Sequence, residues 1–192
     1  MLKNKNYLSP TFIDVYQIED LKLCDDLIKY YKSHKKEYGM KGLVGANGVL
    51  NKKAKDSTDV FFFNQSQDKT IKKFFKILTA CLEDYMKKYQ IQNPLFTDTN
   101  NKLQYYAPGG GYPEAHYERN VKSAVKRQLV YMLYLNTVKD KGGTEFIFQN
   151  VVTPAIKGNL LIWPAEFTHL HRGIISPTEK KYIATGWFEI VG

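Results

Sequence analysis

Short runs of aromatic and β-branched residues, separated by Gly and Pro, fill the second half of the chain from about Leu95. Such runs predict short strands with turns between them, and many in succession indicate an all-β sandwich or barrel. Residues 127–135 are apolar on both faces, which predicts a central strand covered on both sides. Gly142 and Gly143 are typical of a hairpin turn. The predicted strands are 103–106, 127–135, 144–148, 151–153, 159–163 and 181–191.

The first half of the chain is dominated by two amphipathic patterns of helical period. One predicts a helix that ends near Gly39, and the other predicts a helix over 69–89 with Asp68 as its N-cap. Strands are expected at 11–18 and 60–63.

Between these elements, the segment from Gly39 to Asp59 is rich in Gly, Asn and Lys. It predicts a long loop that could form a lid over a substrate. We expect an α+β fold that is mainly β: a double-stranded β-helix (jelly roll, cupin-like) with supporting N-terminal helices. Residues 1–192 are expected to form a single domain, with 1–95 as helical support and loop and 96–192 as the jelly-roll core with a metal site.

The composition is that of a globular protein, with 192 residues of which 43% are hydrophobic. No apolar run is long enough to span a membrane, and the N-terminus lacks the apolar segment of a secretory signal. Cys24 and Cys81 fall within the amphipathic patterns and are expected to be buried free thiols rather than a disulfide. Together these features predict a cytoplasmic protein.

The formal net charge of +9 raises the question of a nucleic-acid partner. Only Arg119, Arg127 and Arg172 among the 28 basic residues are arginines, and the lysines are spread over the whole chain. Recognition of phosphates and bases favours arginine. A solvated lysine surface is therefore preferred, and nucleic acid is not favoured as a partner.

One group of residues has the composition of a metal site. His116 and Glu118 are separated by one residue, so on an extended strand they point to the same side. With His171 they would form two imidazoles and a carboxylate on one face of a metal, an arrangement that suits Fe(II) enzymes activating O₂. Ten residues after His171, Lys181 can hold the far carboxylate of an acidic co-substrate, whereas Lys180 would point to solvent.

His169 competes with His171 for the role of the second histidine. The two residues are two positions apart on one extended segment, so both could face the same way. These residues alone leave the choice open, and the family resemblance described next, through its interval to Lys181 and the form of residues 171–173, favours His171. With His171 as the ligand, His169 is either a supporting or substrate-facing residue, or a polar residue packed near the rim of the site.

The order and spacing of these motifs resemble the Fe(II)/2-oxoglutarate-dependent dioxygenase superfamily, in its prolyl 4-hydroxylase-like branch. The resemblance covers roughly residues 103–190. Its motifs are 105–118 (YYAPGGGYPEAHYE), 134–136 (YLN), 142–146 (GGTEF), 154–158 (PAIKG), 163–164 (WP), 169–173 (HLHRG) and 181–187 (KYIATGW).

The resemblance implies that His116, Glu118 and His171 bind Fe(II), with Glu118 where the family usually has aspartate. It implies that Lys181 binds the distal carboxylate of 2-oxoglutarate. Tyr106 and Tyr134 match positions whose hydroxyls face the co-substrate, although both could instead be core aromatics. Thr185 could add a further hydroxyl.

These features predict an Fe(II)- and 2-oxoglutarate-dependent hydroxylase that uses O₂, with ascorbate as a supporting reductant. Its substrate would be a prolyl or other amino-acid residue of a peptide or protein, or a small molecule. Two alternatives remain open: a non-catalytic jelly-roll binding module, and a zinc hydrolase, since two histidines and a glutamate also bind Zn²⁺.

Overall fold

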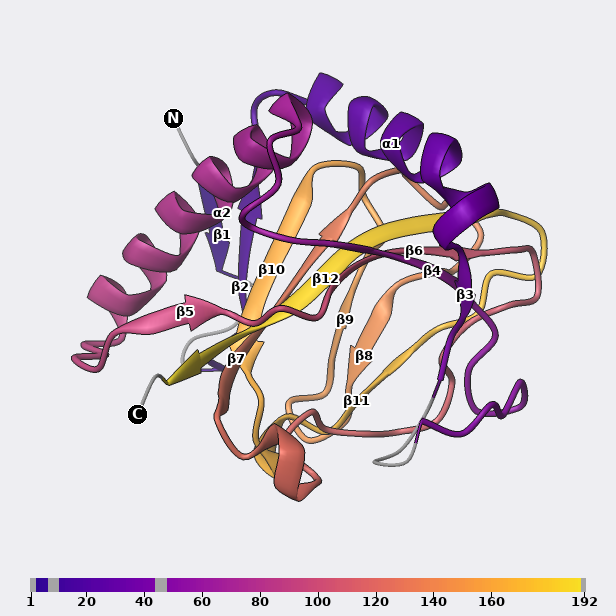
Figure 1. Cartoon of the computed structure of the whole chain (residues 1–192). Coiled ribbons are helices and arrows are strands. Elements are labelled where there is room, and N and C mark those ends of the chain that lie inside the picture. The colour runs from indigo at the N-terminus through magenta and orange to yellow at the C-terminus, as the bar shows by residue number, and fades with distance from the viewer. Residues whose placement is uncertain (1–2, 7–10, 44–47, 191–192) are drawn as a thin grey trace.

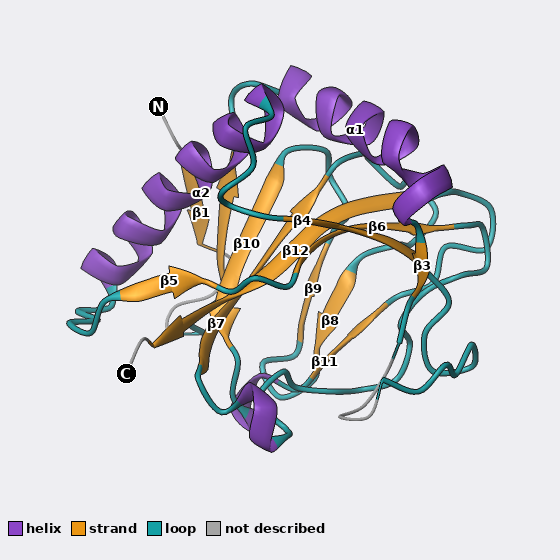
Figure 2. Cartoon of the chain, in the orientation of Figure 1, coloured by secondary structure: helices purple, strands orange, loops and turns teal. Residues whose placement is uncertain are grey.

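Two β-sheets lie face to face, and two helices cover the outer face of the larger sheet (Figure 1). The structure is a computed structural model that describes residues 3–6, 11–43 and 48–190. Both long helices, α1 (Lys22–Tyr38) and α2 (Lys69–Lys88), lie on the same side of the large sheet (Figure 2). This arrangement confirms the predicted jelly-roll fold with supporting helices.

Among the described residues the larger sheet has nine strands, in the order β1-β2-β10-β7-β12-β6-β4-β3, with β5 paired to β12. Its strands are β1 (Lys3–Asn6), β2 (Asp14–Gln17), β3 (Met40–Lys41), β4 (Thr58–Phe62), β5 (Leu95–Thr97), β6 (Asn101–Tyr106), β7 (Arg127–Tyr134), β10 (Asn159–Pro164) and β12 (Lys181–Ile190). The smaller sheet has the order β11-β8-β9, formed by β11 (His171–Gly173), β8 (Thr144–Phe146) and β9 (Val151–Thr153).

Strand β7 shows how the core is divided into two layers. Its residues Leu129, Tyr131 and Leu133 belong to the cluster that packs against the helices. Its residues Val130 and Met132 belong to a second cluster between the two sheets. Because alternate residues of a strand face opposite sides, a strand that is covered on both faces must be apolar throughout. The predicted central strand is confirmed, and β7 lies between β10 and β12.

The helices form where the amphipathic patterns predict them, and α1 ends at Gly39. Cys24 and Cys81 lie on their buried faces as free thiols, as expected, and burial raises the pKa of both to about 12. In the described part of the chain, no helix is long and apolar enough to cross a membrane.

The structure differs from the sequence prediction in three respects. Strands β1, β5 and β11 were not predicted, and the first half of the chain contributes strands to the large sheet as well as helices. Gly142 and Gly143 do not form a hairpin, because β7 and β8 belong to different sheets. The loop after Gly39 contains the short strand β3, and residues 44–47 of this loop lie outside the described residues.

The N-cap of α2 gives a test of the fold. Asp68 accepts hydrogen bonds from the backbone N–H groups of Thr70 (2.7 Å) and Ile71 (3.1 Å). Asp68→Ala removes both acceptors and should lower the free energy of unfolding by about 1 kcal/mol, measured by urea denaturation. Asp68→Asn keeps an N-cap oxygen and is the control. Equal losses in both variants would show that the cap contributes nothing through these bonds.

Candidate active site

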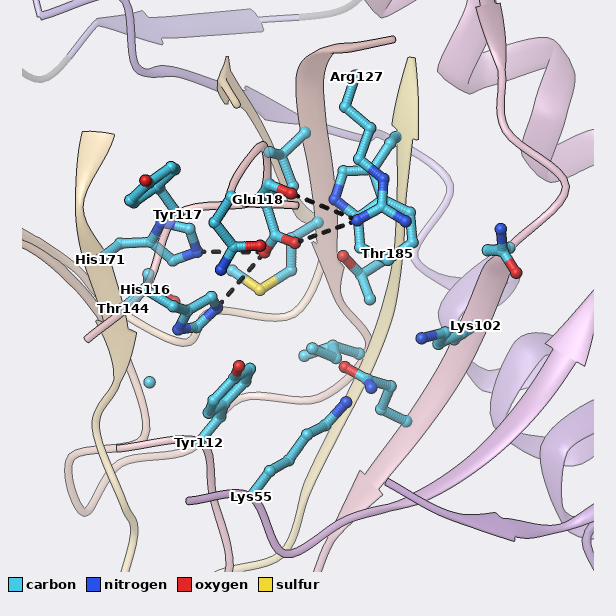
Figure 3. Close-up of a pocket in the computed structure, with 18 of the residues that line it drawn as sticks. Lys55, Lys102, Tyr112, His116, Tyr117, Glu118, Arg127, Thr144, His171 and Thr185 are labelled. Atoms are coloured by element: carbon cyan, nitrogen blue, oxygen red, sulfur yellow. Dashed lines mark hydrogen bonds and ion pairs between the residues drawn. The ribbon is translucent and has the colours of Figure 1, made fainter. Parts of the chain in front are cut away.

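A cavity of about 360 Å³ is lined by residues of both sheets and of the loops beside them, some of which Figure 3 labels. The inner face of β12 lines it with Lys181, Ile183, Thr185 and Trp187, which are alternate residues of the strand. Alternate residues of β6, from Lys102 to Tyr106, line it in the same way. The polar residues named in the sequence analysis therefore point inward because of strand periodicity.

His116 and His171 are joined directly through their backbones. The N–H of His116 donates to the carbonyl of His171, and the N–H of His171 donates to the carbonyl of His116, both at 2.9 Å. His116 lies in an isolated bridge rather than in a regular strand. The N–H of Glu118 donates to the carbonyl of Ala165 (3.2 Å), which fixes the next part of this segment.

The three side chains converge on one point (Figure 3). The Nε2 atoms of His116 and His171 lie 3.4 Å and 3.6 Å from Oε1 of Glu118. One ligand atom from each residue lies within 4.8 Å of the other two. Neighbouring ligands of an ion with bonds of about 2.1 Å lie roughly 3 Å apart, so a small contraction around an ion would complete this site.

The hydrogen bonds of the imidazoles leave the correct nitrogen free for a metal. Nδ1 of His116 lies 2.8 Å from the carbonyl of Glu114, and Nδ1 of His171 lies 2.8 Å from the carbonyl of His169. A carbonyl only accepts, so each Nδ1 carries a proton and each Nε2 presents a lone pair. Metal-binding histidines are usually oriented by such bonds.

The charges of the site also suit a divalent cation. Burial alone would raise the pKa of Glu118, but His116 and His171, when protonated at Nε2 in the absence of a metal, hold that pKa well below its usual range. Burial lowers the pKa of His171 and favours its neutral form. An ionised carboxylate and neutral imidazoles are the protonation states that metal binding requires. The residues present therefore fit Fe(II).

The structure separates His169 from this group. His169 is only 4% exposed, and its Nε2 lies 2.9 Å from the carbonyl of Thr11. Its Nδ1 lies 3.0 Å from Oγ1 of Thr168. Both ring nitrogens therefore have partners away from Glu118, and His169 ties its turn to the segment before β2.

Lys181 lies in the same cavity and is 6% exposed. Its Nζ donates to the carbonyl of Gly142 (2.9 Å), and no carboxylate of the described residues lies within 4.0 Å of it. Burial lowers the pKa of Lys181 to about 8. A buried ammonium without a counter-anion is unfavourable, so this site fits a ligand carboxylate. Lys180 is exposed, as the alternation predicts.

Of the other residues predicted to face the co-substrate, Tyr106 and Thr185 line the cavity and Tyr134 does not. Tyr106 and Thr185 line the cavity, where Tyr106 donates to Oε1 of Gln104 (3.1 Å) and Thr185 donates to the carbonyl of Tyr131 (2.9 Å). Tyr134 does not line the cavity. Its hydroxyl is 2.7 Å from Oγ1 of Thr144, which does. Any effect of Tyr134 on a ligand would therefore pass through Thr144.

Arg127 is a site residue to which the sequence analysis assigned no role. Its guanidinium carbon lies 3.6 Å from the centroid of the Trp187 ring. Its NH1 lies 3.9 Å from Oε2 of Glu118 and donates to the Glu118 carbonyl at 3.5 Å. The only signal in the sequence was that all three arginines lie near the metal motifs.

A shift in strand register brings Arg127 to this face. Phe188 of β12 is opposite Leu129, but Glu189 is opposite Arg127, so β7 has an extra residue at this point. A β-bulge of this kind changes which residues face inward beyond it. Strict alternation from Val130 and Met132 would instead have placed Gln128 on the inner face.

Comparison with known proteins agrees with this geometry. The sequence model of the 2OG-Fe(II) oxygenase superfamily matches residues 102–189, which contain the whole triad and Lys181. Residues 102–189 therefore belong to the 2OG-Fe(II) oxygenase superfamily. No curated protein shows significant sequence similarity to this oxygenase.

Solved structures of prolyl hydroxylases share the fold of this oxygenase. A viral collagen prolyl hydroxylase from Paramecium Bursaria Chlorella virus-1, in complex with 2-oxoglutarate, has a TM-score of 0.71 at 18% identity, covering 97% of this chain and 100% of the other. A Pseudomonas putida prolyl-4-hydroxylase has a TM-score of 0.73 at 14% identity, covering 96% of each chain.

A third similar structure is the Trichoplax adhaerens prolyl hydroxylase in complex with a hypoxia-inducible-factor peptide fragment. It has a TM-score of 0.73 at 14% identity, covering 95% of this chain and 86% of the other. At these identities the likeness establishes the shared fold of the oxygenase.

The geometry predicts which histidine binds metal. His171→Ala should abolish binding of Fe(II), measured by anaerobic calorimetric titration, because it removes the Nε2 ligand atom that lies beside the Glu118 carboxylate. His169→Ala should keep measurable binding, because its ring nitrogens face Thr11 and Thr168. Normal iron binding by His171→Ala, with none by His169→Ala, would reverse the assignment.

Lys181→Ala should weaken 2-oxoglutarate binding to the Mn(II)-loaded protein by about tenfold or more, since removing one partner of a buried charge pair typically costs about 2–5 kcal/mol. Lys180→Ala is the adjacent control and should leave the affinity unchanged. Metal affinity should be preserved in both variants. A loss confined to Lys180→Ala would remove Lys181 from the co-substrate site.

The wild-type affinity for 2-oxoglutarate should also depend on pH. Free Lys181 has a pKa of about 8, and a bound carboxylate favours its charged form. Affinity should therefore be constant below pH 8 and fall as the pH rises above it. Titrations across this range measure the effect, and Lys181→Ala should lose that dependence.

Proposed function

We propose that this oxygenase hydroxylates a prolyl residue or another amino-acid residue, in a peptide or as a small molecule. The observation that carries the proposal is the convergence of two histidine Nε2 atoms and the Glu118 carboxylate in one cavity with the buried Lys181, which has no carboxylate partner among the described residues. The prolyl hydroxylases that share the fold support the substrate class, and one of them was solved with a peptide.

In this proposal His116, Glu118 and His171 would hold Fe(II), a ligand set that suits enzymes activating O₂. Bound iron would supply the chemistry by which O₂ oxidises both partners: 2-oxoglutarate becomes succinate and CO₂, and one C–H bond of the substrate becomes C–OH. One oxygen atom enters succinate and the other enters the new hydroxyl group.

The surrounding residues hold the ligands of this site in place. Trp163 stands edge-on to the His171 ring, with centroids 5.2 Å apart and planes at 78°. Together with the Nδ1 hydrogen bond to the His169 carbonyl, this contact restricts rotation of the imidazole. Arg127 contacts both the backbone and the carboxylate of Glu118, which limits the freedom of the longer side chain.

Other lining residues bind and shield the co-substrate. Lys181 would pair with its distal carboxylate, near the hydroxyls of Tyr106 and Thr144. Met132 and Ile183 add apolar side chains to the same lining. A substrate that displaces water from this pocket would strengthen the charge interactions within it and limit side reactions.

The test is succinate formation by the iron-loaded protein with 2-oxoglutarate, O₂ and ascorbate, against a panel of prolyl peptides and free amino acids. A product heavier by one oxygen atom identifies the substrate. Binding of 2-oxoglutarate without succinate, even when substrates are present, would indicate a binding module. Metal-dependent hydrolysis without succinate would indicate a zinc hydrolase.

Glu118 should be essential in this assay. Glu118→Ala should abolish succinate formation, because it removes the only carboxylate of the triad. Glu118→Asp should retain part of the activity, because it keeps the charge and donor type on a shorter side chain. Undiminished turnover by Glu118→Ala would place the carboxylate outside the metal site.

A further inference from the structure

Lys102 lies at the other end of the cavity from Lys181. In the register of β6 and β12, Lys181 is opposite Tyr106, whereas Lys102 is opposite Thr185. Lys102 is therefore four residues further along the sheet, about 13 Å away at the usual rise per residue. Figure 3 shows Lys102 on the side of the cavity away from His171, and a second lysine, Lys55, whose Nζ lies 5.6 Å from the centroid of the Tyr112 ring.

Lys102 is a charge without an anionic partner in the described part of the chain. No carboxylate there lies within 4.0 Å of its Nζ, which instead lies 5.3 Å from the ring centroids of both Phe61 and Trp187. Burial lowers the pKa of Lys102, and the charge of Lys55 lowers it further, while the more distant carboxylates of Asp59 and Glu118 offset this only in part. The aromatic rings attract the ammonium only weakly compared with an anion.

Lys55 is held in place by the carboxylate of Asp59, both of whose oxygens accept hydrogen bonds. Its Nζ lies 3.3 Å from Oδ2 of Asp59, which also accepts from Gln104 (2.9 Å), while Oδ1 accepts from Ser57 (2.7 Å). Lys55 is only 5% exposed, yet it lines the cavity. Its remaining ammonium protons are therefore available to a ligand, with the side chain already ordered.

The loop that carries Lys55 packs closely against this group. A Cβ on Gly42 would lie 2.2 Å from Oγ of Ser57 and 2.9 Å from Cε of Lys55. Only glycine allows this approach. Leu43 and Gly48 of the same loop also line the cavity. These described residues of the loop therefore contribute to the cavity lining beside Lys55.

Trp187 supplies a further donor at this end. Its indole N–H is buried and has no hydrogen-bond partner in the described structure, although the ring is fixed between Lys102 and Arg127. Buried N–H groups normally have partners. An unpaired donor beside an unpaired ammonium, both in the lining of one cavity, is what a carboxylate-binding site contains.

We propose that Lys102, assisted by Lys55 and the indole N–H of Trp187, binds a carboxylate of the substrate. The proposal rests on the proposed function and deepens it, because 2-oxoglutarate is already matched by Lys181 at the opposite end. The substrate would then carry a carboxylate close to the carbon that is oxidised. This group is either the α-carboxylate of a free amino acid or an acidic side chain beside the reacting residue of a peptide.

The test measures binding of paired probes to protein loaded with Mn(II) and 2-oxoglutarate. One pair is L-proline and L-prolinamide, and the other is the doubly blocked dipeptide Pro-Asp and its Pro-Asn counterpart. The carboxylate member of at least one pair should bind about tenfold or more tightly than its amide. Preference within the first pair identifies an α-carboxylate, and preference within the second identifies an acidic side chain.

Lys102→Met should abolish this preference, because methionine keeps the apolar stem between Phe61 and Trp187 and removes the charge. Lys102→Arg should restore part of it, and Lys180→Met is the exposed control that should not change it. Affinity for 2-oxoglutarate should be unaltered in Lys102→Met, which also shows that this variant is folded.

Two results would overturn the proposal: equal binding of acid and amide in both pairs, or a preference that survives in Lys102→Met. The second result would mean that Lys102 serves only to pack against aromatic rings. Because these measurements need no turnover, a carboxylate preference in a protein that never forms succinate would contradict the proposed function alone.

Discussion

The site depends on one pair of backbone hydrogen bonds, in which His116 and His171 donate to each other at 2.9 Å. His116 lies in an irregular segment, whereas His171 begins β11, which is paired with β8 in the smaller sheet. The bridge therefore holds the irregular segment that carries His116 against the smaller sheet. Without it, two segments more than fifty residues apart would have no reason to direct their imidazoles at one carboxylate.

Burial of unpaired charge is the second constraint on this fold. Lys181 and Lys102 have no carboxylate partner in the described residues, and they lie at opposite ends of one lined cavity. Each lowers the stability of the ligand-free protein. Such groups are expected where ligands provide the missing charge, which is the basis for assigning one anion subsite to each lysine in the proposals above.

Glu118 stands where the family usually has aspartate, and a neighbouring arginine restricts its longer side chain. Arg127 stacks on Trp187 and contacts both the carbonyl and the carboxylate of Glu118. These contacts restrict a side chain that has one more rotatable bond than aspartate. The bulge that places Arg127 on the inner face and the longer acid are therefore parts of one arrangement.

Local periodicity was enough to predict both helices, the central strand β7 and the opposite directions of Lys180 and Lys181. Each depends on which side of a helix or strand a residue faces, and this follows from chain position alone. The sequence also predicted that His116 and Glu118 act together, but they lie in an irregular segment whose backbone bonds to His171 and Ala165 direct them, not in the expected strand.

Tertiary structure decided the rest: that His169 turns to Thr11, that Tyr134 lies behind Thr144, that a bulge turns Arg127 inward, and that Lys55 and Lys102 line the same cavity. These depend on which strands are neighbours and in what register, which is set by long-range pairing and packing and not by any local pattern.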